Sequence, residues 1–265
     1  MNFAREQSLL RQRLQAQGSP ALGAARQQEL GTATTFLGAG DEAIAAAATD
    51  LAAMHPQMGR AQMTAFVRTL WQSKIYELRA VGIELLAARA SLLEPADLVF
   101  LEGLLAESEV DALAQRLAGD VIGVLVSKHK KLWKDLRRYA AASQDVLRRA
   151  AVRASRLPLA DDSEAFPRFA ELAEPLLAVP DETLQQEIDE VLSAAAATHG
   201  DAVKEFAARH GRVVKLPKKK AGKAAAKPAV AAAAAGIMVP TKTKPKQAPR
   251  AKGEAGSKRA GQKKG

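Results

Sequence analysis

The sequence contains no cysteine among its 265 residues, which excludes disulfide bonds and thiolate metal sites. Aromatic residues make up only 4% of the chain, so its core must consist mainly of Leu, Ala and Val. Four histidines lie far apart along the chain, without the spacing of metal ligands: His55, His129, His199 and His210. We therefore expect neither a metal site nor another bound cofactor.

Long apolar runs are also missing. No stretch of 18 clean apolar residues is present, and the first residues, MNFAREQSLLRQRLQAQG, lack the apolar centre of a secretory signal. These absences predict a cytoplasmic protein without a membrane partner. Alternating apolar and polar residues and Asn-Gly hairpin signals are missing too, which argues against β-structure.

Charge is distributed unevenly along the chain. Residues 212–265 hold 16 Lys and Arg against the single acid Glu254, a net charge of +15, whereas residues 1–211 hold 23 bases and 28 acids, a net charge of −5. Within this acidic body, residues 127–157 hold ten bases against two acids, a net charge of +8. A basic zone on an acidic body predicts one face for a polyanion.

The segment 212–265 has the Lys, Ala and Pro composition of a linker-histone tail. It contains too few large apolar residues to offset the entropy of ordering, so we expect a disordered tail. A solubilising role is one interpretation of it. Contact with nucleic-acid backbone is the other, because mobile positive charges bind phosphates without a fold.

The body, residues 1–211, is predicted to be all-α. Apolar residues recur at helical spacing in segment after segment, separated by short turns. Such helices form antiparallel pairs, and each pair needs a neighbour to bury its apolar face. A HEAT-like α-solenoid satisfies this requirement, and a closed helical bundle is the alternative.

Several segments resemble the DNA alkylation repair family, the AlkD-like alkylpurine DNA glycosylases with HEAT-like repeats. Residues 66–87 match at Leu70-Trp71, Glu77 and Ala80, and FLGAG at residues 36–40 resembles an N-terminal FLG element of the family. EVDALAQRLAGD at residues 109–120 resembles the family's catalytic segment, with Val110-Asp111 followed by Gly119-Asp120. RYAAASQDVLRRAAV at residues 138–152 resembles the segment with the DNA-contacting Arg, through Tyr139, Ser143 and Arg149.

The resemblance implies that Asp111 is the catalytic carboxylate and that Arg149 grips a phosphate of duplex DNA. From the residues alone, Asp111 has a second interpretation, because an acid at the start of a helix favours the helix dipole and caps free N–H groups. Arg153 lies one turn from Arg149 on the same helical face, whereas Arg148 points about 100° away. The remaining predicted DNA contacts are basic residues of the same zone: Arg148, Arg153, Lys128, Lys130, Lys131 and Lys134.

The sequence departs from the family where aromatic side chains bracket the lesion. Glu107 and Glu190 stand at two family Trp positions, and Gln27 or Glu29 stands at that of a Tyr. We expect a monomer, associated with the nucleoid, that docks on double-stranded DNA through residues 127–157 and excises alkylated purines. Two alternatives stay open: a DNA-binding architectural or damage-recognition protein without excision, and a protein-interaction scaffold.

Overall fold

The computed structural model of the protein describes residues 1–214. The chain divides into two units, Met1–Lys219 and Lys220–Gly265, and the described residues all belong to the first. The predicted basic tail thus lies outside the described residues, apart from its first three. The α-helices are α1 (Phe3–Gln17), α2 (Pro20–Leu30), α3 (Asp41–Met54), α4 (Arg60–Gln72), α5 (Tyr76–Ala88), α6 (Leu98–Ala106), α7 (Asp111–Arg116), α8 (Gly123–Lys128), α9 (Trp133–Ala140), α10 (Asp145–Ala154), α11 (Arg156–Asp161), α12 (Phe166–Ala173) and α13 (Glu182–Arg209).

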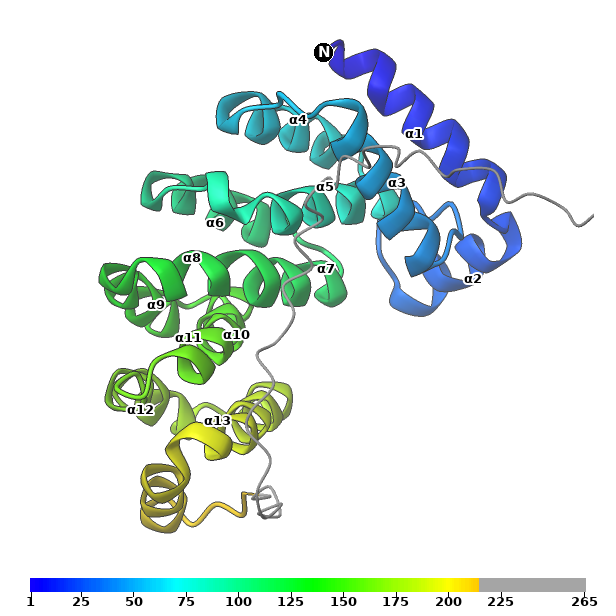
Figure 1. Ribbon diagram of the computed structural model, residues 1–265. Coiled ribbons are helices and arrows are strands. Elements are labelled where there is room, and N and C mark those ends of the chain that lie inside the picture. Colours follow the sequence, from blue (N-terminus) through cyan, green and yellow to red (C-terminus); the bar gives the residue numbers. More distant parts are fainter. Residues whose placement is uncertain (215–265) are drawn as a thin grey trace, which may run out of the picture. The chain divides into compact units, whose positions relative to one another are not determined.

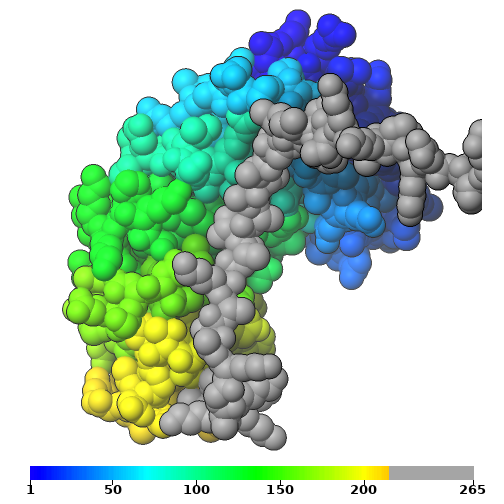
Figure 2. Space-filling model, in the orientation of Figure 1, coloured from blue at the N-terminus to red at the C-terminus, as the bar shows by residue number. Residues whose placement is uncertain are grey.

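The helices follow one another in layers along the chain (Figure 1). Helices α3, α4 and α5 pack together, α9 packs on α10, and α10 packs in turn on α13. In the space-filling view the colours pass from blue to yellow in successive bands, so segments close in sequence are also close in space (Figure 2). Within residues 1–214 the chain forms no strand beyond one isolated bridge between Thr35 and Ile75. The predicted all-α, HEAT-like solenoid is confirmed.

One apolar core runs through these layers. Its largest fully buried side chains include Trp71, Tyr139, Phe66 and Phe169, and most of the rest is Leu, Ile, Val and Ala, as the low aromatic content predicts. Trp133 is also buried. These aromatic residues therefore pack in the core and do not offer surfaces for stacking bases.

The loop at residues 36–40 is held by a buried carboxylate. Glu77 of α5 is fully buried and accepts hydrogen bonds from the backbone N–H groups of Leu37, Gly38 and Ala39, at 2.9, 2.8 and 3.3 Å. Gly38 has a φ of 78°, and a Cβ there would meet the backbone oxygen of Ser19 at 2.1 Å. Two segments that resemble the family, the FLG element at residues 36–40 and Glu77, thus contact each other. This contact joins the loop between α2 and α3 to α5.

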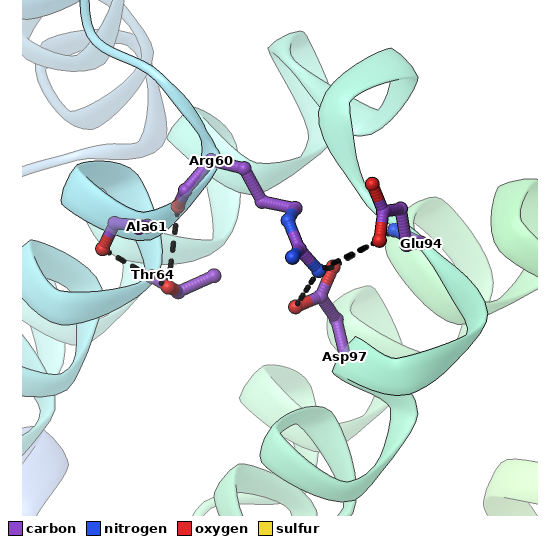
Figure 3. A network of polar contacts seen from close by, with 5 residues as sticks. All are labelled: Arg60, Ala61, Thr64, Glu94 and Asp97. Carbon is purple, nitrogen blue, oxygen red and sulfur yellow. Dashed lines mark hydrogen bonds and ion pairs between the residues drawn. The ribbon is translucent and has the colours of Figure 1, made fainter.

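Ion pairs on the surface join neighbouring layers. Arg60, the first residue of α4, places its Nη1 3.1 Å from Asp97 and 3.2 Å from Glu94, in the turn before α6 (Figure 3). Thr64 donates back to the Arg60 carbonyl at 3.2 Å. The ion pairs of Arg60 are partly exposed, and such pairs contribute less than about 1 kcal/mol to stability.

The helix that begins at Asp111 extends well beyond α7. A π-helical turn, Leu117–Ile122, connects α7 to α8 with helical backbone angles at both junctions. Asp111 and Lys128 therefore lie at opposite ends of one helical segment, about 25 Å apart at roughly 1.5 Å per residue.

Candidate functional site

Asp111 is the first residue of α7, directly after an extended Val110 whose side chain is buried. Burial of Val110 fixes the start of the helix and leaves the Asp111 side chain half exposed, at 50%. The start of α7 has no side-chain capping hydrogen bond. Asp111 thus lies where its charge favours the helix dipole, but its oxygens do not cap the helix.

The Asp111 carboxylate is instead held by an arginine from another helix. Arg153 of α10 donates from Nη1 to Oδ1 at 3.2 Å and from Nη2 to Oδ2 at 2.9 Å. Two parallel bonds of this kind fix the orientation of a carboxylate as well as its position. The Arg153 side chain is only 7% exposed and holds Asp111, while its predicted contact with a DNA phosphate stays a prediction.

A second carboxylate lies behind Arg153. Glu187 of α13, with 9% of its side chain exposed, accepts from the same Nη2 of Arg153. The pKa of Glu187 is raised to about 7, because burial, which raises it, outweighs the charge and hydrogen bond of Arg153, which lower it. Asp111, Arg153 and Glu187 thus form a chain of charges that runs from the surface into the protein, which we call the Asp111–Arg153–Glu187 chain.

Arg149 completes the group on the exposed side. It lies one turn before Arg153 on α10, with its Nη1 3.7 Å from Oδ1 of Asp111 and 23% of its side chain exposed. The structure therefore brings the predicted catalytic and phosphate-binding residues, Asp111 and Arg149, side by side. Arg148 points elsewhere, donating to the Ala142 carbonyl and pairing with Asp145 at the start of its own helix.

The predicted lysines lie away from this group. Lys128 donates to the Ala90 carbonyl at 3.3 Å, and Lys130 pairs with Asp162 at 2.8 Å. Lys131 and Lys134 are exposed in the turn before α9 and on α9 itself. Lys128 is about 25 Å from Asp111 along one helix, so the predicted face for DNA, which stays a prediction, spans at least this distance.

Acidic side chains stand at the two positions where the resemblance predicts Trp. Glu107 follows α6 and is exposed, and Glu190 is exposed on α13. The Glu107 carbonyl accepts from Arg79 at 3.5 Å, while nearby Glu109 accepts from the hydroxyls of Thr32 and Thr34 at 2.9 and 3.1 Å. These hydrogen bonds hold the pKa of Glu109 below its usual value.

Sequence reasoning missed Glu187 as part of the site. Its signal is visible in retrospect, because Glu187 interrupts the apolar stripe of Leu184, Ile188 and Val191 on α13. An acid on the buried face of a helix needs a partner. Arg153, flanked by Ala and Val on α10, gives the complementary signal.

Two kinds of site are not found among residues 1–214. They contain no group of three or more His, Cys, Asp or Glu side chains arranged to hold a metal ion. No helix in the same part of the chain has both the length and the apolar composition to span a membrane.

These features define a helical-repeat protein with a clamped surface carboxylate beside a basic side chain. The family model described as DNA alkylation repair enzyme matches residues 10–224, which is most of the chain. The protein belongs to this family. Among curated proteins, no significant match to the chain was found.

Proposed function

We propose that the protein is a DNA glycosylase that excises cationic N3- or N7-alkylated purines from duplex DNA, with Asp111 as the catalytic carboxylate. The observation that carries this proposal is the half-exposed Asp111 carboxylate, oriented by Arg153 and adjacent to Arg149. A carboxylate fixed before the reaction stabilises developing positive charge without reorganising. Membership of the DNA alkylation repair family supports the substrate class.

The chemistry requires little beyond this placement. In an alkylated purine of this kind the base carries a positive charge, which weakens its bond to C1′ of the sugar. The bond breaks with its electron pair remaining on the base nitrogen, so the base leaves neutral and the sugar becomes an oxocarbenium ion. Asp111 stabilises that cation, water adds to C1′ and releases a proton, and an abasic site remains.

Arg149 is proposed to grip a phosphate beside the damaged nucleotide and so set its position against Asp111. The lysines at the far end of the α7–α8 segment are proposed to contact phosphates about seven base pairs away, at roughly 3.4 Å per base pair. The substrate is then chromosomal DNA in the cytoplasm, bound by a monomer, and the basic tail adds contacts to the nucleic-acid backbone.

A second candidate function is DNA binding without excision. It is favoured by Glu107 and Glu190, which stand where aromatic side chains would stack on a cationic base. Both are exposed, and each adds a negative charge that repels phosphate. Binding to alkylated duplex with no release of base would select this function over the first.

The deciding experiment is a single-turnover excision assay on methylated duplex DNA with wild type and Asp111→Asn. Loss of the main electrostatic stabiliser is expected to lower the rate by at least about a hundredfold. DNA affinity should stay equal or rise, because a negative charge near phosphate is removed. Equal losses of folding stability and activity would instead assign Asp111 a structural role at the start of α7.

A further inference from the structure

The Asp111–Arg153–Glu187 chain has a feature that orientation of Asp111 alone does not require. Arg153 is buried, and its Nη2 contacts a carboxylate on each side. We propose that Glu187 is a positioning residue of this site: it neutralises the buried Arg153 from behind and so leaves Asp111 its negative charge toward a cationic sugar. This inference rests on the proposed function of Asp111.

The three groups of the Asp111–Arg153–Glu187 chain differ in how deeply they are buried. Arg153 and Glu187 have 7% and 9% of their side chains exposed, whereas Asp111 has 50% exposed. Water screens the Asp111 end, but it reaches the other two groups poorly, so the charges of Arg153 and Glu187 act on each other strongly. Only the Asp111 end is open to a ligand.

The charge of Glu187 decides the net charge of the three groups. A salt bridge between Asp111 and Arg153 alone has no net charge, and it offers little to an oxocarbenium ion. With an ionised Glu187 the three groups carry a net charge of −1. If Arg149 is neutralised by a DNA phosphate, that negative charge is left to face the sugar at the exposed Asp111 oxygens.

The same arrangement makes the site depend on pH near neutrality. The charged groups that act on Glu187 are Arg153 and Arg149 from α10 and Asp111 from α7. Helices α11 and α12 also pack on α13, but near His199, where Leu159 and Phe166 meet it about 18 Å further along the helix. Burial raises the pKa of Glu187 to about 7, so its charge appears as pH rises through neutrality.

The test compares binding to two duplexes that contain a stable abasic analogue, one a cationic pyrrolidine and the other a neutral tetrahydrofuran. The ratio of their affinities measures how well the site stabilises a sugar cation, and it needs no turnover. Glu187→Gln keeps the shape and an oxygen acceptor for Arg153, and it is expected to lower the wild-type preference for the cationic duplex about tenfold. Glu182→Gln, an exposed acid on the first turn of the same helix, is the matched control and should leave the preference unchanged.

A pH series on the wild type tests the proposal on the unsubstituted protein, with Glu187→Gln as the comparison. The preference for the cationic duplex should increase between about pH 6 and pH 8, with a midpoint near the Glu187 pKa of about 7. This increase should be absent in Glu187→Gln. If Asp111→Asn abolishes the preference while Glu187→Gln keeps it at every pH, the role of Glu187 is overturned and that of Asp111 stands. If wild type and Asp111→Asn both show no preference, the proposed function is overturned and this inference with it.

Discussion

At the scale of single residues, the two buried carboxylates Glu77 and Glu187 have opposite surroundings. Glu77 accepts three backbone N–H groups, all from the loop at residues 36–40. Glu187 has one arginine as its partner, and its Oε2 is buried without a hydrogen bond from any described residue. The first carboxylate thus contributes to stability, whereas the second costs stability when it is charged.

Replacing Glu77 tests whether its carboxylate stabilises the fold. Glu77→Gln puts an amide N–H₂ against backbone donors and leaves at least one of them buried without an acceptor. We expect the free energy of unfolding to fall by at least about 2 kcal/mol, measured by urea denaturation. A loss below about 0.5 kcal/mol would show that the loop does not depend on this carboxylate.

Glu187 predicts a pH dependence of stability. Its folded-state pKa of about 7 lies above the ordinary value of 4.5, so between these two pH values the folded protein holds a proton that the unfolded chain has released. This group therefore lowers the free energy of unfolding as pH rises from about 5 to about 8, and it adds no further change above that range. Urea midpoints of wild type should fall over this window relative to those of Glu187→Gln, and parallel curves for the two proteins would contradict the assignment.

At the scale of helices, apolar spacing predicts the elements well because each layer buries one face. The same reasoning places Asp111 at a helix start and Arg149 on a helix face, and both are found there. It does not foresee the ion-pair partners of the basic zone, because a charge count along the chain cannot show which way each side chain points. Arg137 and Arg138 on α9 pair with Glu171 of α12 and Glu102 of α6, each more than 30 residues away in sequence.

Contacts between helices that sequence reasoning could not foresee also carry stability. Arg89, which follows α5, donates to the carbonyls of Ala52, His55 and Met58 at 2.8 to 2.9 Å. These carbonyls lie at the end of α3 and in the turn that follows, where no helical N–H group reaches them. A charged side chain that satisfies several such groups stabilises the layer more than a surface ion pair does.

This difference predicts unequal effects of two arginine substitutions. Arg89→Ala is expected to lower the free energy of unfolding by about 2 to 4 kcal/mol, because the carbonyls of Ala52 and Met58 lose their donor, while that of His55 keeps the Met58 N–H. Arg60→Ala, which removes the partly exposed pair with Asp97 and Glu94, should cost less than about 1 kcal/mol. Urea melts of the two variants under the same conditions make the comparison, and equal losses would contradict it.

At the scale of the whole molecule, the charges separate into a body and a tail. Arg212 pairs with Asp189 at 2.6 Å and bonds Gln185, and Val214 packs against the core. Arg212 thus belongs to the folded body, although the predicted boundary of 211 assigns it to the tail. Residues 215–265 then keep 15 Lys and Arg against Glu254, a net charge of +14.

Removing the tail therefore has a different expected effect from removing Arg149. Each phosphate that a base neutralises contributes about −0.9 to the slope of log K against log salt. Ending the chain after Val214 should lower the affinity for duplex DNA at low salt and flatten this slope by several units. It should leave excision chemistry unchanged, because the candidate site lies wholly within residues 111–187.

Arg149→Ala should show the opposite pattern. Since it removes one fixed phosphate contact, the salt slope should change by only about one unit. Excision, or docking at a defined position, should nevertheless suffer, because Arg149 sets where the DNA lies against Asp111. Titrating wild type and both variants on one duplex at several salt concentrations measures both effects. If the salt slope stays the same without the tail, nucleic acid is not the tail's partner and the tail's charge serves solubility instead. If Arg149→Ala flattens the slope as much as the truncation does, the division between mobile contacts of the tail and fixed contacts of the body is wrong.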